Sequence, residues 1–219
     1  MFGKIGLIFN GVWSQYAMAM APKYRDIYQL LYIHDLNDNQ LKDLDALVVP
    51  FQSHQSALAS HRDALYRFLA SDRKIAVFGD STPLWIDAQW EDRPVNNYWW
   101  VTDPKKPPIT QTDSSHPVFA PLEPRHGCWH THGAYTRIPP EAKVVQRNEA
   151  GEVITWQTSE HGGTLFVSTL DPIVEHGIQQ IRHLDHFVDS LTEWLCGKKP
   201  QGRFEVCADA YGVSESSLV

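Results

Sequence analysis

The stretch KIAVFGDSTP, residues 74–83, decides how the rest of the chain is interpreted. It opens with a short apolar run that stops at Gly79, where small polar residues and a proline follow. Such a run is typical of a buried parallel strand, and open α/β sheets bind their ligands at the carboxyl ends of these strands. The turn at Gly79 is therefore the first place to look for chemistry.

The segments before this stretch alternate between strand and helix patterns. Apolar runs predict strands over residues 4–10, 27–33 and 46–51, and helices are predicted over residues 13–22, 37–44 and 56–70. The last helix has Leu58, Leu65 and Phe68 near one face. Because a strand, a helix and a strand in this order form a parallel βαβ unit, the first half predicts a flavodoxin-like, doubly wound α/β fold.

The pattern changes after residue 84. Residues 84–124 form an irregular insertion rich in tryptophan and proline, in which residues 98–101 are the best candidate for a strand. Residues 143–157 predict a hairpin, residues 164–170 another strand and residues 178–196 a closing helix. We therefore expect one domain over residues 1–199, with a mostly parallel sheet flanked by helices, an antiparallel β extension and a polar tail over residues 200–219.

Composition excludes several classes of protein. The chain has 219 residues, 42% of them hydrophobic, so a sizeable core is expected rather than disorder. The net charge of −7 and the absence of a basic stripe argue against nucleic acid and anionic membrane as partners. No apolar run approaches the roughly 18 residues of a membrane span. Three cysteines without a CxxC motif suit a reducing compartment, so we expect a cytoplasmic location.

Four stretches, in this order, carry a family resemblance. They are DALVVP at residues 45–50, the helix RDALYRFL at 62–69, HPVF at 116–119 and GGTLFVSTL at 162–170. With them the chain resembles the class I glutamine amidotransferase-like superfamily over about residues 4–197, and within it the ThuA-like (trehalose-utilisation) branch. The resemblance implies a flavodoxin-like fold and a connection with carbohydrate metabolism.

The chain departs from the superfamily at both catalytic positions. Superfamily amidotransferases have a G-x-C-x-G elbow, whereas this chain has Gly79-Asp80-Ser81-Thr82-Pro83, with serine in the cysteine position. The catalytic histidine position of the family falls on Asp171. Because glutamine hydrolysis needs a thiolate to attack and an imidazole to shuttle the proton, we expect no glutaminase activity.

The leading hypothesis is a domain that binds a small polar ligand, with carbohydrate as a candidate. The residues expected to contact that ligand lie at strand ends or present aromatic faces: Asp80, Thr82, His54, Trp99 and Trp129. The alternative is a hydrolase with Ser81, Asp171 and His176 as catalytic residues. In that reading a histidine, either His176 or His54, must reach the serine hydroxyl; otherwise Ser81 and Thr82 only cap the segment that follows.

A second alternative is a metal-dependent enzyme built on HGCWHTH, residues 126–132. If this stretch is extended, its histidines and its cysteine share one face, because side chains alternate along a strand. His130, His132 and Cys128 would then be ligands of zinc or iron, with a further ligand from Asp171 or His176. Otherwise the stretch is a polar, aromatic-rich edge whose histidines meet solvent and backbone carbonyls.

We expect the chain to bind a small molecule. Association with further copies of itself, as a homo-oligomer, is a second candidate interaction. If residues 98–101 form a strand, the adjacent Trp99 and Trp100 point to opposite faces, and one of them is available for an interface between copies.

Overall fold

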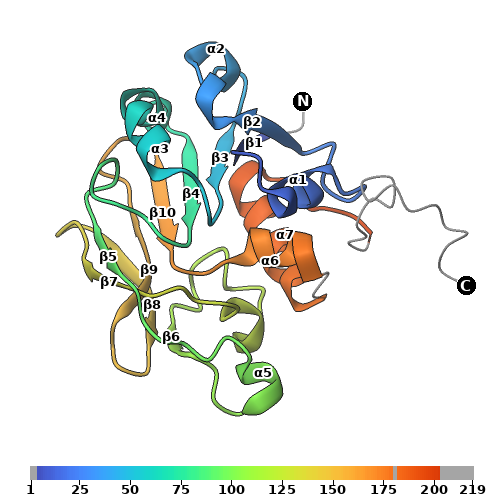
Figure 1. Cartoon of the computed structure of the whole chain (residues 1–219), viewed down its shortest axis with the longest axis vertical. Helices are drawn as coiled ribbons and strands as arrows, with labels where there is room; N and C mark the ends of the chain where they lie inside the picture. The colour runs from blue at the N-terminus through green and yellow to red at the C-terminus, as the bar shows by residue number, and fades with distance from the viewer. Residues whose placement is uncertain (1–3, 180–181, 203–219) are drawn as a thin grey trace, which may run out of the picture.

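The described part of the chain forms one ten-stranded sheet with helices on both faces (Figure 1). The computed structural model describes residues 4–179 and 182–202. Five strands are parallel in the order β2-β1-β3-β4-β10, with bounds β1 Ile5–Phe9, β2 Tyr28–Tyr32, β3 Ala46–Val49, β4 Lys74–Phe78 and β10 Thr164–Ser168. The predicted doubly wound α/β class is confirmed.

Past β10 the sheet continues with antiparallel strands. These are β9 Val153–Thr158, β8 Lys143–Asn148, β7 Ala134–Arg137, β6 Ile109–Thr112 and β5 Gln89–Glu91. The predicted hairpin is the pair β8 and β9, and the antiparallel extension is thereby confirmed. The sequence did not reveal β5, β6 or β7, because each has only three or four residues and too few alternations to show a period of two.

Helices cover the two faces of the sheet separately. The helices α1 Trp13–Met20, α6 Pro172–Gln179 and α7 Arg182–Cys196 contribute to one core, and α2 Asp38–Leu41, α3 Gln55–Ser60 and α4 Arg62–Leu69 contribute to the other. Alternate residues of β4 enter different cores: Ala76 and Phe78 the first, Ile75 and Val77 the second. This explains why the strand reads as a continuous apolar run, since both of its faces are buried.

Residues 98–101 do not form the predicted strand. They include most of a one-turn helix, α5 Trp99–Thr102, and in the turn before it the amide of Tyr98 donates to Oδ1 of Asn96 at 3.1 Å. Trp99 and Trp100 both pack against Trp129, with ring centroids 6.5 and 5.3 Å away. The prediction was wrong because this tertiary contact outweighs the β propensity of the aromatic residues.

Two predicted helices also differ in extent. The helix predicted over residues 56–70 is divided at His61 into α3 and α4. A helix begins at Pro172, directly after β10, earlier than the predicted closing helix. Most of the predicted tail, from residue 203 onward, lies outside the described residues. No helix within the described ranges is long and apolar enough to cross a membrane.

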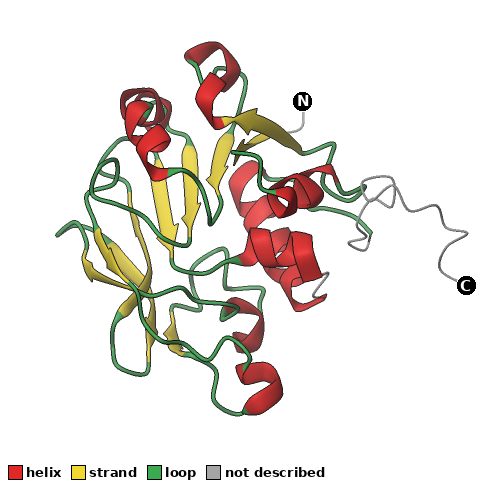
Figure 2. Cartoon of the chain, viewed as in Figure 1, coloured by secondary structure: helices red, strands yellow, loops and turns green. Residues whose placement is uncertain are grey.

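The carboxyl ends of the parallel strands face the β-rich extension. The arrows of β3, β4 and β10 run toward the part of the molecule that holds the insertion and α5 (Figure 2). Segments from residues 84–134 therefore lie near the sheet edge where the sequence predicts the site.

Candidate functional site

The turn after β4 depends on Gly79. Its φ is +80°, and a Cβ added there would collide with the ring of Phe51, which follows β3. Only glycine meets both conditions, because other residues strain at this φ and no room exists for a side chain. The amide of Gly79 donates to the carbonyl of Ser168 at 2.9 Å. Asp80 and Ser81 are thus fixed at the carboxyl edge of the sheet.

Ser81 has a buried phenol as its partner rather than an imidazole. Its side chain is buried, and its hydroxyl lies 2.9 Å from that of Tyr135, the one described side chain to which it hydrogen bonds. Burial raises the pKa of Tyr135, so the phenol keeps its proton at neutral pH. The described residues therefore supply no base for a serine nucleophile.

A second segment reaches the site from the insertion side. Residues 128–132, called the strap below, form an isolated antiparallel bridge between Thr131 and Leu170 just past β10. The amide of His132 donates to the carbonyl of Thr169 at 3.0 Å, and the amide of Asp171 donates to the carbonyl of His130 at 2.8 Å. The strap thus brings two histidines to the start of α6.

The strap is not the straight strand on which the metal hypothesis depends. Residues 124–127 form a 3-10 turn and His130 has a φ of +39°, so the histidines and the cysteine do not share one face. His126 stacks on His186 of α7 with centroids 4.4 Å apart. The buried Cys128 thiol donates to the carbonyl of Arg125 at 3.4 Å. The expectation of one shared face was wrong.

His132 lies at the centre of the candidate site. Its ring stacks on Phe51, with centroids 4.0 Å apart and planes 18° apart. Its Nε2 lies 3.5 Å from Oδ2 of Asp171, and its side chain is 26% exposed. The aromatic stack fixes the plane of the imidazole, and the carboxyl group faces one of its nitrogens.

Two carboxyl groups interact electrostatically with this imidazole. Asp171 is 1% exposed, and its Oδ1 caps α6 by accepting from the amide of Val174 at 3.1 Å. Burial raises the pKa of Asp171 and also that of Asp80, and the charge of His132 opposes both shifts. Asp80, His132 and Asp171 are therefore electrostatically coupled.

His130 forms a second pair, which is closed to solvent. Its Nδ1 lies 3.1 Å from Oε1 of Glu175, and its side chain is 6% exposed. The ring stacks on Trp129, with planes 2° apart. Trp129 and Trp99, both predicted to contact ligand, are themselves buried in the packing of the insertion.

The remaining predicted residues lie apart from this centre. His176 is fully buried, and its Nε2 lies 2.8 Å from Oδ1 of Asp185 on α7. The exposed His54 caps α3, because its Nδ1 accepts from the amide of Ala57 at 3.2 Å. Thr82 is half-buried in the turn after Ser81. The structure brings Asp171 and His132 together, and among the described contacts neither His176 nor His54 pairs with Ser81.

The donor atoms of the described residues are not grouped as a zinc or iron centre requires. No group of three or more His, Cys, Asp or Glu side chains within the described ranges is placed to hold a metal. Burial raises the pKa of the Cys128 thiol to about 12, which disfavours the thiolate that a metal requires. His130 and His132 instead pair with separate carboxyl groups.

Sequence reasoning missed the residues that hold His132 in place. The side chain of Asn97 binds the strap twice: its Nδ2 donates to the carbonyl of Thr131 at 3.1 Å, and its Oδ1 accepts from the amide of Thr131 at 3.0 Å. Phe51 and Tyr135 also contact the site from other segments. Nothing in the spacing of these residues could have indicated contacts that only tertiary folding creates.

Comparisons with known proteins bear on the fold. No protein-family model matches the sequence, and no curated protein matches it. A Thermoplasma acidophilum protein, described as one of the subunits of GMP synthase, has a TM-score of 0.56 at 13% identity, over 89% of this chain and 96% of that one. A ThuA-like protein from Bacteroides uniformis matches with a TM-score of 0.55 at 12% identity, over 92% and 94% of the two chains.

An exo-β-1,4-mannosidase from Opitutaceae bacterium strain TAV5 has a similar region. The TM-score is 0.56 at 10% identity, over 90% of this chain and 36% of the mannosidase. At such low identities these similarities establish a shared fold, consistent with the class I glutamine amidotransferase-like fold that the sequence predicts.

Proposed function

We propose that this chain is a class I glutamine amidotransferase-like domain without glutaminase activity, which binds a small uncharged polar ligand beside Asp80, His132 and Asp171. One observation carries the proposal. At the two positions where glutamine hydrolysis requires a cysteine and a histidine, this chain has Ser81 and Asp171, and neither side chain is placed to catalyse that reaction. Ser81 hydrogen bonds to Tyr135, and Asp171 caps α6.

No other cysteine in the described ranges replaces the missing thiol. Cys128 lies in the strap with its thiol bonded to a backbone carbonyl, and burial raises its pKa. Cys196 lies at the end of α7, and burial raises its pKa as well. Since the thiolate is the attacking species, neither thiol is prepared to attack an amide.

The charges around Asp80 and Asp171 favour an uncharged ligand. Asp80 and Asp171 contribute carboxyl groups, and none of the ion pairs among the described residues joins either of them to a lysine or an arginine. An anionic ligand such as a phosphorylated sugar would be repelled by these carboxylates. Hydroxyl groups suit them, because an ionised carboxylate accepts hydrogen bonds.

Carbohydrates are the first ligand class to test. They present several hydroxyl groups without net charge, and the mannosidase with a similar region acts on a carbohydrate. The ThuA-like neighbour has the same fold over nearly its whole length. Both observations support carbohydrate as the ligand class, and the carboxyl groups of Asp80 and Asp171 favour a ligand without negative charge.

Binding is tested by saturation-transfer NMR and calorimetry with neutral mono- and disaccharides, including glucose, mannose and trehalose, and with glucose 6-phosphate. We expect at least one neutral sugar to bind and glucose 6-phosphate to bind more weakly. His132→Gln and Asp80→Asn should each weaken sugar binding about tenfold, as expected when one or two hydrogen bonds to a ligand are lost.

His161→Gln is the matched control. His161 precedes β10 at the opposite end of the strand and contacts Tyr66, so this substitution should leave binding unchanged. Ammonia released from glutamine above a protein-free blank would overturn the proposal. Sugar binding that neither His132→Gln nor Asp80→Asn weakens would also overturn it, and the absence of binding by every sugar would exclude carbohydrate as the ligand class.

A further inference from the structure

We infer that Asp171 holds His132 in the tautomer with its proton on Nε2, so that Nδ1 is a hydrogen-bond acceptor placed to receive a hydroxyl group of the ligand. The inference deepens the proposed function and rests on it for the class of ligand. It assigns Asp171 as a positioning residue and His132 as the residue that recognises a hydroxyl donor.

The first step concerns the two atoms that face each other. His132 Nε2 and Asp171 Oδ2 are 3.5 Å apart and both are buried, and neither atom makes a hydrogen bond within the described residues, so each is the nearest polar group that can satisfy the other. An ionised carboxylate can only accept a hydrogen bond, so a favourable contact requires the proton on Nε2. In a neutral imidazole the other nitrogen, Nδ1, is then an acceptor.

The second step concerns the exposure of the ring. Nε2 is buried, yet the His132 side chain is 26% exposed, so its exposed surface lies elsewhere on the side chain. Nδ1 makes no hydrogen bond within the described part of the chain, yet it is not among the buried atoms that lack a partner, so part of its surface is exposed. It is therefore the polar atom of this side chain that a ligand can reach.

The third step is that the ring is held before any ligand arrives. Phe51 fixes its plane by stacking at 4.0 Å, and the paired hydrogen bonds of Asn97 fix the backbone of the neighbouring Thr131. An acceptor held in this way costs little conformational entropy on binding and favours a ligand that places a donor opposite it.

A competing arrangement must be considered, because several acidic groups surround the ring. Asp80 approaches from the turn after β4, Asp171 from the end of β10 and Glu175 from α6, where it pairs with His130. Burial raises the pKa of Asp171. If its carboxyl group kept a proton, it would donate to Nε2 and place the proton of the ring on Nδ1, which makes Nδ1 a donor.

Nitrogen-15 NMR of histidine-labelled protein distinguishes the two arrangements without any ligand. The spectra are recorded about two pH units above the ordinary imidazole pKa of about 6.5, where a neutral ring is expected. The signals of His132 are identified by their loss in His132→Gln. In the wild-type protein we expect Nε2 to carry the proton and Nδ1 to be bare.

Asp171→Asn should invert this pattern. Its amide oxygen can still cap α6, since asparagine is as good a cap as aspartate, while its NH₂ group would face Nε2 as a donor. The two ring nitrogens should then exchange their protonation states. Glu175→Gln is the matched control: it alters the carboxyl group beside His130 and should leave the tautomer of His132 unchanged.

Two results would overturn the inference: a wild-type His132 that carries its proton on Nδ1, or a folded Asp171→Asn protein whose His132 tautomer is unaltered. The wild-type spectrum is decisive even if Asp171→Asn does not fold. Because no sugar is present, a failed binding assay would contradict the proposed function alone, and an inverted wild-type tautomer would contradict this inference alone.

Discussion

Two histidine–carboxyl pairs lie near α6 and differ in what surrounds them. At the start of the helix, the partly exposed His132 faces Asp171 across 3.5 Å. Within the helix, His176 is fully buried and lies 2.8 Å from Asp185. The residue types are the same in both pairs, but the first pair is accessible to a ligand and the second is closed.

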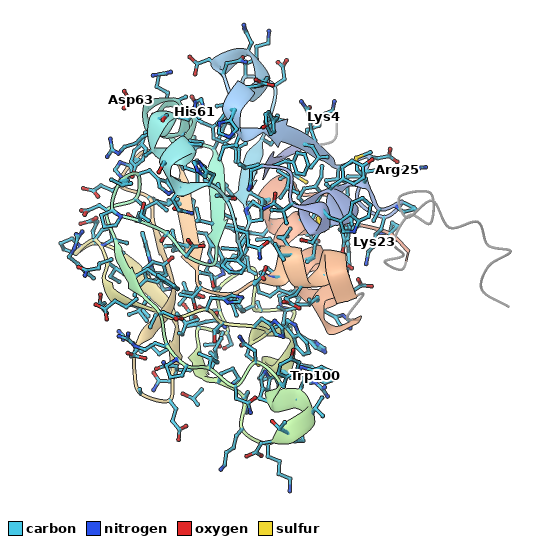
Figure 3. All side chains as sticks on the ribbon, in the orientation of Figure 1. Lys4, Lys23, Arg25, His61, Asp63 and Trp100 are labelled. Carbon is cyan, nitrogen blue, oxygen red and sulfur yellow. The ribbon has the colours of Figure 1, made fainter. Side chains whose placement is uncertain are left out.

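The closed pair belongs to a compensated charge cluster. Lys23, whose side chain is 2% exposed, lies 3.4 Å from Asp185 and 2.8 Å from Asp189. The hydroxyl of Tyr24 donates to Asp189 at 2.9 Å. Figure 3 shows Lys23 between α1 and the pair α6 and α7. A lysine thus balances the carboxylates of this cluster, whereas none of the ion pairs among the described residues gives Asp171 such a partner.

The comparison teaches how to tell a structural histidine from a candidate functional one. A buried pair that gains a third, opposite charge holds helices together, because each charge has lost its water and needs its partners. A pair with one exposed ring and no compensating cation keeps an atom free for a ligand. The four predictions below test this difference, from the largest expected effect to the smallest.

Removing Lys23 should cause the largest loss of stability. Lys23→Met leaves the carboxyl groups of Asp185 and Asp189 without their cation, which typically costs about 3–5 kcal/mol. Urea unfolding followed by circular dichroism measures the change. Arg25→Met, at an exposed neighbour, should change stability by less than about 0.5 kcal/mol. Equal effects of the two substitutions would show that the cluster is not structural.

Adding a side chain at Gly79 should lower the free energy of unfolding by nearly as much. Gly79→Ala combines about 1–2 kcal/mol of backbone strain at positive φ with about 1–3 kcal/mol for the collision with Phe51. Gly151→Ala is the matched control, because Gly151 has a φ of +79° and nothing within 4 Å of an added Cβ. The difference between the two unfolding free energies measures the collision alone, and a difference near zero would argue against the close approach.

Removing the Ser81 hydroxyl should have a moderate effect. Ser81→Ala leaves the buried hydroxyl of Tyr135 without a partner, at a cost of about 1–3 kcal/mol. The double variant Ser81→Ala with Tyr135→Phe removes both polar groups and should recover most of this loss. A double-mutant cycle of unfolding free energies tests the coupling, and simple additivity of the two changes would contradict it.

Asp171→Asn should stabilise the protein modestly, by about 0.5–2 kcal/mol at pH 7. The pKa of Asp171 is raised above its ordinary value of 3.8, so ionisation costs more in the folded state than in the unfolded state. This cost is fully present above the folded pKa and disappears as the pH falls toward 3.8. The advantage of asparagine should therefore shrink in acid.

Unfolding experiments at several pH values measure this trend. The exposed Asp26→Asn should show no comparable pH dependence. If Asp171→Asn were instead less stable than the wild type at pH 7 and equally stable in acid, the ionised carboxylate would be stabilising. That result would contradict the conclusion that burial makes ionisation of Asp171 costly.

The sheet was predictable, whereas the centre of the site was not. The five parallel strands are apolar runs with both faces buried, and their order along the chain fixes the βαβ units. The sequence also placed the turn after β4 at the sheet edge and marked Asp171 at the end of β10. The sequence predicted His132 as a metal ligand and His176 as the base for Ser81. Neither contact could be checked from the sequence, because it does not show which side chains lie close together.

By itself, then, the sequence determined the α/β scaffold and the identities of Ser81 and Asp171 in the segments that follow β4 and β10. These features depend on local apolar runs and on residue identity, which a linear chain displays. The tertiary structure decided that the strap delivers His132 to Asp171, that Tyr135 receives the Ser81 hydroxyl and that His176 belongs to a closed cluster. Each of these contacts joins segments distant in sequence, and packing rather than spacing determines them.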